Sequence, residues 1–416
     1  MPMYDVLVVG AGLAGLTCAK RLKEEEVSFL VLEASNAIGG RVRTDIVDGF
    51  QLDRGNQVLL TAYPEAQRQL DYDALDLHPF YPGALVWFGG RFHKIADPFR
   101  LPWEGLKSLF SPVGTVLDKI RIGRLRRKVL AGTVEELFSR PETTTLEYLR
   151  RSGFSEEMID RFYRPFLGGI YFDWDLNVSS RMFEFGFRMF STGETALPSK
   201  GIGAIAEQLA IRLPDSALEL NSRVQSLRPG KIRLESGEDI SGQVIILATE
   251  ETEAARLLGD ETQPGFRSST NIHLAAEEPP VPEPIVIMNG EQTGPVNTMY
   301  VPSNVARSYA PEGQALIAVN VIGNPSQTDE ELEHEIRNQM RSWFGSQADA
   351  WRHLRTNRII YSLPRHEPPV TRSPWEPIEK APRLLVCGAY RSVDSFQWAM
   401  ASGRRAAEVA IETIRG

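Results

Sequence analysis

A group of three glycines separates an apolar run from an amphipathic segment at the start of the chain. Residues 4–9 (YDVLVV) form a short valine-rich run that predicts a buried strand. The sequence GAGLAG follows at residues 10–15, and helical spacing continues from about 13 to 25. Residues 28–33 (SFLVLE) predict a second strand, which completes a βαβ unit in about thirty residues. This order of elements predicts a parallel α/β sheet that binds a dinucleotide.

Each glycine of this motif has a separate task. Gly10 permits the tight turn after the strand, and Gly12 lets the backbone approach a pyrophosphate. Gly15 lets helix and strand pack closely, while the free N–H groups at the helix N-terminus attract the anion. Glu33 ends the second strand, where its carboxylate can accept hydrogen bonds from the ribose hydroxyls of adenosine. Since this acid would repel a 2′-phosphate, NADP is disfavoured.

Length and composition narrow the class of protein. The chain has 416 residues, which exceeds a comfortable single domain and predicts two packed domains. Its formal net charge of -8 argues against nucleic acid as a partner, because phosphate binding needs a basic surface. Two cysteines, Cys18 and Cys387, cannot build a disulfide framework, so a reducing cytoplasmic compartment is expected. No apolar run reaches the roughly 20 residues that cross a bilayer, so no membrane span is expected.

Strand candidates far from the N-terminus indicate that the nucleotide-binding domain is discontinuous. Residues 243–249 (QVIILAT) and 383–387 (RLLVC) are two short candidates for buried strands. We expect an α/β, Rossmann-type nucleotide-binding domain in three pieces, together with a discontinuous α+β substrate-binding domain that has a mixed sheet and helices. The predicted boundaries are 1–75, 198–262 and 378–416 for the first domain and 76–197 and 263–377 for the second.

A second glycine-rich stretch favours FAD over NAD as the dinucleotide. It comprises residues 38–44 (IGGRVRT), in which Gly39 and Gly40 let the chain close in and Arg41 can meet the pyrophosphate. Residues 53–57 (DRGNQ) follow after a short spacer. The two blocks extend the predicted site beyond the first βαβ unit.

Together these blocks resemble the flavin amine oxidase and phytoene desaturase superfamily, which includes the protoporphyrinogen oxidases, and they are most similar to its phytoene desaturase-like branch. The resemblance implies FAD as the cofactor, with the glycine–arginine stretch lying along its diphosphate. It also implies that Gly55, Asn56 and Gln57 run beside the isoalloxazine ring. Similar blocks occur at residues 198–209 (PSKGIGAIAEQL) and 395–403 (SFQWAMASG), the second at the pyrimidine end of the flavin.

The same resemblance implies the remaining cofactor contacts. Residues 221–224 (NSRV) match the strand whose backbone touches adenine, which assigns that role to Val224. The other implied contacts are Leu13, Ala14, Ala34, Ala248, Gly388, Ala389, Phe396, Gln397 and Ala399.

The chain departs from the superfamily at two places. Members usually carry an acid just after the glycine that matches Gly388, where it holds the ribityl chain, but Ala389 stands there; backbone groups or Asp394 could replace that hydrogen bond. Monoamine and polyamine oxidases carry a lysine, bridged by water to flavin N5, at the position aligned with Asn271. A tyrosine of their aromatic cage aligns with Ser395. The second departure weighs against amine oxidation.

No catalytic side chain is identified from the sequence. Flavin chemistry needs little from the protein beyond orientation, exclusion of water and tuning of the ring. No two of the six histidines lie three to five residues apart, so a metal site is not expected, and each histidine is interpreted as surface or locally hydrogen-bonded. No G-x-S-x-G motif occurs, which excludes an esterase-type nucleophile.

Aromatic residues are concentrated in residues 162–190, where there are ten in 29 positions. Such a cluster forms either part of a hydrophobic core or the lining of an apolar tunnel that faces the flavin, and both interpretations stay open. Within it, residues 164–169 (RPFLGG) resemble the desaturase and protoporphyrinogen oxidase pattern more than that of the amine oxidases.

Residues 98–128 form a basic segment with interleaved apolar residues. Eight basic residues face only two acids, Glu104 and Asp118, in a chain that is acidic overall. One interpretation places the segment in a membrane interface, with cations on lipid headgroups and apolar groups below. The other is a solvated helix whose apolar side packs on the substrate-binding domain. The interleaved apolar residues are Phe99, Leu101, Trp103, Leu106, Leu109 and Phe110.

These features favour an oxidoreductase in which FAD accepts a hydride at N5 from an apolar, extended substrate, such as a carotenoid-like polyene or a porphyrinogen. The reacting C–H bond would lie near Asn56, Gln57 and the turn at 395–397, and reduced flavin would pass its electrons to oxygen or a quinone. Three alternatives stay open: flavin amine oxidation, redox-neutral polyene isomerisation with reduced FAD, and a protein in which FAD is only structural. We expect a cytoplasmic protein, peripheral at a membrane if segment 98–128 binds lipid.

Overall fold

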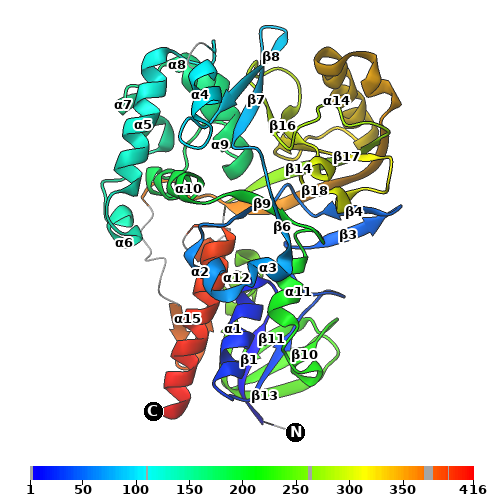
Figure 1. Cartoon of the computed structure of the whole chain (residues 1–416). Helices are drawn as coiled ribbons and strands as arrows, with labels where there is room; N and C mark the ends of the chain where they lie inside the picture. Colours follow the sequence, from blue (N-terminus) through cyan, green and yellow to red (C-terminus); the bar gives the residue numbers. More distant parts are fainter. Residues whose placement is uncertain (1–2, 109–110, 261–264, 370–377, 392) are drawn as a thin grey trace.

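Two large sheets, each packed against helices, lie one above the other along the long axis of the molecule (Figure 1). The sheet in the lower half of Figure 1 lies near both chain ends. Leu109 and Phe110 of the basic segment lie outside the described residues, as does the chain around the predicted boundaries at 262–263 and 377. The computed structural model describes residues 3–108, 111–260, 265–369, 378–391 and 393–416.

The lower sheet combines three separated pieces of the chain. Its parallel strands are, in spatial order, β10 (Leu218–Glu219), β2 (Phe29–Leu32), β1 (Met3–Val9), β13 (Asp239–Leu247) and β20 (Leu384–Val386). β12 (Lys231–Leu234) pairs antiparallel with the start of β13 and carries β11 (Val224–Arg228) on its outer side, while β19 (Ile378–Ala381) pairs with β20. The central strands are nearly continuous apolar runs because both of their faces are covered. The predicted α/β fold class is confirmed.

Helices cover both faces of the lower sheet. α1 (Leu13–Glu24) and α15 (Phe396–Arg415) pack on one face, and α12 (Glu251–Leu258) packs on the other. α1 and α15 cross at very close range, since a Cβ at Gly403 would lie 2.0 Å from the carbonyl oxygen of Ala14. Only glycine fits at that crossing.

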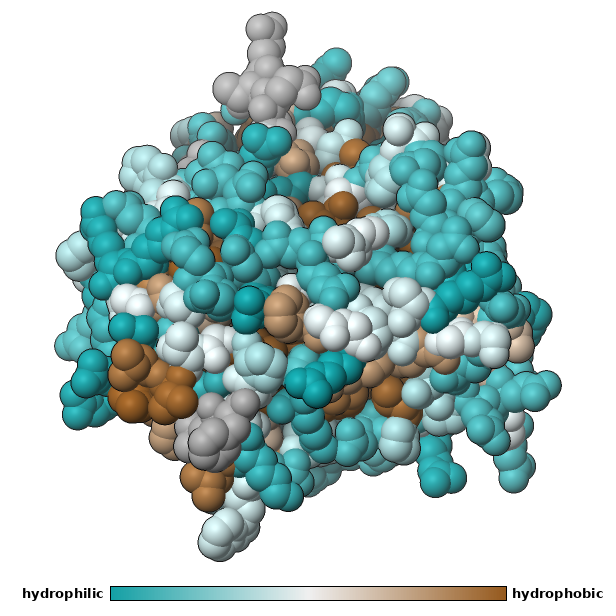
Figure 2. Space-filling view, turned by 90° about the horizontal axis from the view of Figure 1, so that it is seen from above, coloured by the Kyte–Doolittle hydropathy of each residue, from teal (hydrophilic) through white to brown (hydrophobic). Residues whose placement is uncertain are grey.

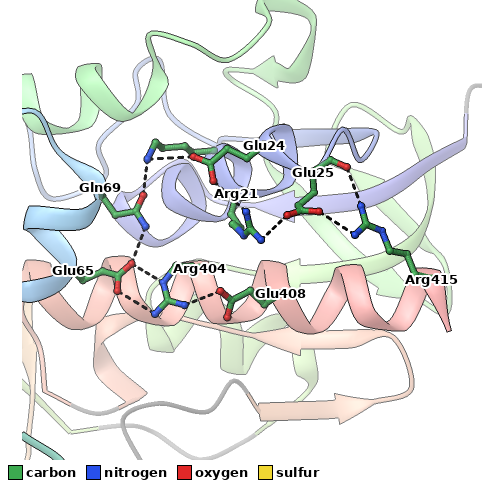
Figure 3. A network of polar contacts seen from close by, with 9 residues as sticks. Arg21, Glu24, Glu25, Glu65, Gln69, Arg404, Glu408 and Arg415 are labelled. Atoms are coloured by element: carbon green, nitrogen blue, oxygen red, sulfur yellow. Dashed lines mark hydrogen bonds and ion pairs between the residues drawn. The ribbon is translucent and has the colours of Figure 1, made fainter.

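Polar contacts attach α15 to α1 and to the short helix α2 (Pro64–Gln69) (Figure 3). The buried carboxylate of Glu65 accepts hydrogen bonds from Arg404 at 2.7 and 3.1 Å. Near the other end of α15, Arg415 donates to the carboxylate of Glu25, which follows α1, at 3.0 Å. Removing one partner of a buried ion pair leaves an uncompensated charge, so the Arg404–Glu65 pair holds the last helix in place.

The upper sheet is mixed, with one parallel pair, β15 and β7, among antiparallel neighbours. Its strands are, in spatial order, β18 (Arg352–Pro364), β14 (Phe266–Ala276), β17 (Ala315–Ile322), β16 (Val296–Tyr300), β15 (Val286–Asn289), β7 (Gly83–Phe88) and β8 (Arg91–Ala96). One face packs on α14 (Asp329–Phe344), whose Leu332, Ile336 and Met340 repeat every four residues and therefore share one side of the helix. The other face turns towards the lower sheet and a layer of helices (Figure 1).

That helical layer comprises α4 (Pro102–Ser108), α5 (Val116–Leu130), α6 (Val134–Phe138), α7 (Thr145–Arg151), α8 (Glu156–Met158), α9 (Arg164–Tyr171) and α10 (Ser180–Thr192). Of the ten aromatic rings in residues 162–190, Tyr163, Tyr171, Phe183 and Phe185 are buried. The other six are half-buried. The cluster therefore contributes to the core and also leaves several ring faces open.

Short strands join the two halves, and a buried carboxylate holds the junction together. Asp53 ends β4 (Phe50–Asp53), which pairs with β3 (Thr44–Val47). It accepts hydrogen bonds from the hydroxyls of Thr44 at 2.6 Å and Tyr309 at 2.8 Å and from the N–H of Ile202 at 2.9 Å. Burial raises the pKa of Asp53 to about 6, against the opposing effect of these bonds. The remaining elements near the junction are β5 (Leu59–Leu60), α3 (Tyr72–Leu75), β6 (Leu77–Pro79), β9 (Thr195–Pro198), α11 (Ala204–Ala210) and α13 (Pro302–Val305).

No helix in the described part of the chain has the length and apolar character needed to cross a bilayer. The same residues contain no group of three histidine, cysteine, aspartate or glutamate side chains arranged to hold a metal ion.

Candidate functional site

The glycine turn after β1 has the geometry that a pyrophosphate requires. Gly10 has a φ of +105°, and a Cβ there would lie 2.8 Å from the carbonyl oxygen of Ala248. A Cβ at Gly15 would lie 1.9 Å from the carbonyl oxygen of Gly10, so neither position tolerates a side chain. No described atom lies within 4 Å of a Cβ added at Gly12, apart from its immediate neighbours. The turn is thus closed on the protein side and open at Gly12.

The second glycine pair lies beside the backbone of Gly12 and leaves this open side free. Gly39 forms a bridge with Gly12, and a Cβ at Gly40 would lie 3.4 Å from the Cα of Gly12. α1 begins here with Leu13 and Ala14; its first turn has no acidic residue and no side-chain N-cap. The free N–H groups and the helix dipole therefore remain available to an anion.

Glu33 lies just beyond the carboxyl end of β2. Its two carboxylate oxygens accept backbone N–H groups, one from the glycine turn and one two residues downstream, both at 2.8 Å. Ala34 beside it is exposed, and the carbonyl of Glu33 accepts the N–H of Ser222 at 2.8 Å. That bond brings the start of β11, with the buried Val224, next to the acid. The predicted ribose and adenine contacts are therefore neighbours.

Arg41 connects the start of α15 to the upper sheet. Its guanidinium donates to both carboxylate oxygens of Asp394, at 2.9 and 3.3 Å, and also to the carbonyl of Ser362. The Asp394 charge raises the pKa of Arg41. The hydroxyl of Ser362 lies 2.7 Å from that of Ser269 on β14. Asp394, which was considered above as a partner of the ribityl chain, is thus paired with Arg41, the residue predicted to contact the pyrophosphate.

The segment after β4 leaves polar atoms without partners. Gly55 has a φ of +96°, and the side chain of Gln57 donates to the carbonyl of Arg41 at 3.0 Å. Both polar atoms of the Asn56 side chain are buried and have no hydrogen-bond partner among the described residues. Since an unsatisfied buried polar group costs about 1–3 kcal/mol, this amide fits a ligand with a polar edge.

The carboxyl ends of β13 and β20 bring two more predicted contacts to one edge of the sheet. Ala248 follows β13, Gly388 follows β20, and the two strands are paired in parallel. The N–H of Gly388 donates to the hydroxyl of Ser402 at 3.0 Å, and Ala389 is buried in a short turn. Ligands of parallel sheets bind at this edge.

The predicted contacts at the start of α15 point in different directions. Phe396 begins the helix and is half-buried, and Ala399 is also half-buried within the first turn. Gln397 is buried, and its side-chain oxygen accepts the N–H of Glu65 at 2.7 Å. The side chain of Gln397 is therefore engaged by α2.

A row of amides crosses the upper sheet beside Gly55. Asn271 on β14 lies opposite Asn320 on β17 and opposite Asn357 on β18, so that the three side chains share one face. The Asn271 amide donates to Oδ1 of Asn320 at 3.1 Å. Oδ1 of Asn271 and Nδ2 of Asn357 are buried and lack partners among the described residues. A Cβ at Gly55 would lie 3.4 Å from Oδ1 of Asn271. We call these three residues the amide row.

Sequence analysis singled out Asn271 but missed the other two members of the amide row. Asn320 is the one polar residue in the strand ALIAVNVI, a signal that a buried side chain needs a polar partner. Asn357 lies among polar residues and gives no such signal. The buried clamp at Asp53 was also missed.

The interpretation of every histidine as surface or locally hydrogen-bonded is wrong for His273 and His366. Both are buried, and each has one ring nitrogen without a partner among the described residues. Burial lowers the pKa of each to about 4, so both are neutral near pH 7. His273 is buried because it lies two residues from Asn271 on the same inner face of β14.

The residues present fit FAD along its whole length. Glu33 can meet a ribose, and Gly12 with the start of α1 can meet a diphosphate. The unpartnered amide of Asn56 and the unpartnered Oδ1 of Asn271 can meet the polar edge of a flavin ring. These groups come from both halves of the molecule and meet at the junction between the sheets.

Known proteins share the fold of this chain. Residues 13–411 match the family model described as flavin containing amine oxidoreductase. Protoporphyrinogen oxidase 2 of Arabidopsis thaliana is 28% identical over 169 residues, which are 39% of this chain and 32% of that protein. A putative protoporphyrinogen oxidase from Exiguobacterium sp. 255-15 has a TM-score of 0.72 at 17% identity, covering 99% of this chain and 100% of that chain. A triple mutant of putrescine oxidase has a TM-score of 0.72 at 15% identity, covering 99% of both chains.

These similarities differ in what they establish. The chain spans about a third of the length of the curated relatives it matches. At identities below 20%, the two solved structures show a shared fold alone. The family model, by contrast, covers nearly the whole chain.

Proposed function

Because this chain belongs to the flavin-containing amine oxidoreductases, we propose that it uses FAD to oxidise a C–H bond of an extended, largely apolar substrate of the polyene or porphyrinogen class. Family membership makes it an FAD-dependent enzyme rather than a protein in which FAD is only structural. Bound FAD supplies the acceptor for a hydride, and oxygen or a quinone is the proposed final acceptor of the electrons. The chain itself binds the cofactor, orients the substrate and excludes water.

The observation that carries this proposal is the amide row. The family resemblance aligns Asn271 with the lysine of amine oxidases, and both neighbours of Asn271 in the row, Asn320 and Asn357, are also uncharged. An amide neither gains nor loses a proton near neutral pH, so it can orient a substrate or ordered water but cannot act as a base. Such a site suits a substrate that is held by shape and weak polar contacts.

Half-buried aromatic rings in the helical layer support an apolar substrate. Phe166 stacks on Phe162 with ring centroids 5.6 Å apart and contacts Phe190 at 5.3 Å, and all three rings are half-buried. Phe162 and Phe166 pack on the part of the upper sheet formed by β7 and β15, and Phe190 belongs to α10. Gly169 of α9 lies against Thr298, which is paired with Asn320 in the sheet. Planar or conjugated molecules pack well on such rings. Protoporphyrinogen oxidases among the similar proteins support the same substrate class.

The test is anaerobic reduction of the purified yellow protein. Protoporphyrinogen IX, coproporphyrinogen III, phytoene and putrescine are added separately, and flavin absorbance near 450 nm is followed. We expect bleaching by a porphyrinogen or the polyene and none by putrescine. Bleaching by putrescine alone would overturn the proposal. Turnover of a polyene only after prior reduction with dithionite, without net oxidation, would instead identify a redox-neutral isomerase.

A pair of variants tests the role of the amide row. Asn271→Leu removes its hydrogen bonds at similar volume, so we expect a fall in the rate of flavin reduction of about tenfold or more, with FAD still bound. Asn338→Leu, at an exposed site on α14, is the matched control and should reduce flavin at the wild-type rate. Equal rates for both variants would exclude orientation by the row.

A further inference from the structure

Exposed apolar side chains gather on α4 and α5. Of the thirteen large hydrophobic side chains that are exposed among the described residues, seven lie between residues 99 and 130. Figure 2 looks down on the end of the molecule that carries α4 and shows apolar surface, in brown, gathered at the lower left on a face that is otherwise mostly hydrophilic. We call the following residues the apolar patch: Phe99, Trp103, Leu106, Val116, Leu117 and Ile120.

One side of α5 is buried and the other is exposed. Leu125 and Val129 are buried against the core of the substrate-binding half. Leu117, Ile120 and Arg124 follow one another at spacings of three and four on the outer side and are all exposed. The helix therefore packs on the domain, as one interpretation of the basic segment predicts, and also presents an apolar surface to the outside.

Charges around the apolar patch are sorted by sign. Asp118 is fully buried, where it accepts hydrogen bonds from Ser155 and pairs with Arg121 at 3.1 Å. The exposed Arg124 and Arg127 have no ion-pair partner within 4.0 Å among the described residues. The outer surface of α5 beside the patch is thus cationic, even though the whole chain carries a net charge of -8. On α4, the half-buried Glu104 is paired with Lys94 at 3.6 Å.

Other arginines hold this surface to the fold. Arg100 donates to the carbonyl of Phe190, and Arg126 donates to the carbonyl of Ser191 at 2.8 Å. The guanidinium of Arg126 also lies 4.4 Å from the centre of the Phe99 ring. The patch is therefore attached next to the half-buried ring of Phe190, which contacts the ring of Phe166.

We propose that the apolar patch and its flanking arginines seat the protein on the surface of an anionic lipid bilayer. Ile120 and Arg124 are one helical turn apart, about 6 Å along the axis, which matches the distance between headgroups and the upper acyl region. Trp103, 81% exposed, lies at the patch, and tryptophan prefers that depth. Binding of the protein to the bilayer does not depend on its substrate, so the test measures vesicle binding and not enzyme activity.

Two vesicle types separate charge from apolar contact. The flavin-loaded protein is sedimented with vesicles of phosphatidylcholine alone or mixed with phosphatidylglycerol. We expect binding to the mixed vesicles, a loss of binding in about 1 M salt, and a blue shift of Trp103 fluorescence on binding that brominated lipid quenches. Trp103→Phe should keep the binding and lose most of that quenching. Sedimentation with neither vesicle type would overturn the proposal.

Matched variants locate the contact. Leu117→Ser with Ile120→Ser, and separately Arg124→Gln with Arg127→Gln, should each lower partitioning by roughly tenfold or more. Ile211→Ser changes a side chain that is 78% exposed but distant in sequence from the patch, and it should bind like the wild type. Unchanged flavin absorbance and melting temperature establish that each variant is folded. If both double variants bind vesicles as the wild type does, the patch is not the lipid contact. The proposal would also be refuted if light scattering showed a dimer of the wild type that the Leu117→Ser, Ile120→Ser variant dissociates, because the patch would then bind a second copy of the chain.

Discussion

Asn271 lies directly against Gly55: a methyl group added to Gly55 would come within 3.4 Å of Oδ1 of Asn271 and within 3.3 Å of Ile359. Gly55 follows the strand that leads out of the cofactor-binding half, whereas Asn271 belongs to the upper sheet. The contact between Gly55 and Asn271 therefore sets the distance between residues 55–57, which are predicted to lie beside the flavin ring, and the amide row.

Gly55→Ala should weaken FAD binding. Its φ of +96° strains any other residue by about 1–2 kcal/mol, and the new methyl would also push against Asn271. Gly237→Ala is the control, because Gly237 has a φ of +91° with open space around it. Both variants should lose similar stability, but only Gly55→Ala should lower the flavin-to-protein absorbance ratio after purification. If both variants lost flavin equally, the contact between the new methyl group and Asn271 would not explain the loss.

Glu33→Gln should raise the dissociation constant for FAD by about 10- to 100-fold. The Gln amide would place an N–H group where the carboxylate now accepts a backbone N–H, and the charge that favours ribose hydroxyls would be lost. Titration of the apoprotein with FAD measures the constant. Glu24→Gln, on the exposed side of α1, should leave it unchanged.

The Asp53→Asn variant should become more stable than the wild-type protein as the pH rises. The folded pKa of about 6 lies above the unfolded value near 4, so the contribution of Asp53 to stability is complete below pH 4 and is lost as pH rises through 6. A shift of two pKa units corresponds to about 3 kcal/mol, the largest advantage expected for the asparagine variant above pH 7. Melting temperatures between pH 4.5 and 8 check this. An advantage of the variant that is constant over this range would contradict the assigned titration.

Arg404→Leu should destabilise the protein by about 3–5 kcal/mol, because the buried carboxylate of Glu65 would lose its partner. Arg415→Leu, on the same helix as Arg404, breaks an exposed pair with Glu25 of the α1 C-cap and should destabilise the protein much less. Urea unfolding curves of both variants provide the comparison. Similar losses would show that burial of Glu65 adds nothing to the pair.

The glycine turn after β1 could be predicted from sequence because its parts are close together along the chain. The strand, the glycines and Glu33 occupy about thirty residues, and the required backbone conformations select glycine at fixed positions. Local chemistry was sufficient there.

The amide row could not be predicted in the same way. Asn271, Asn320 and Asn357 become neighbours only through the pairing register of β14 with β17 and β18, and a shift of one residue would turn Asn271 to the opposite face. The clamp around Asp53 likewise depends on Ile202 and Tyr309, which lie 149 and 256 residues away. Long-range register decides both features.

The close crossing of Gly403 over Ala14 has a consequence for biosynthesis. The first turn of α1, made early in translation, is covered only when α15, the last helix of the chain, leaves the ribosome. We therefore expect ribosome-bound nascent chains that still lack α15 to bind less FAD than the folded protein does.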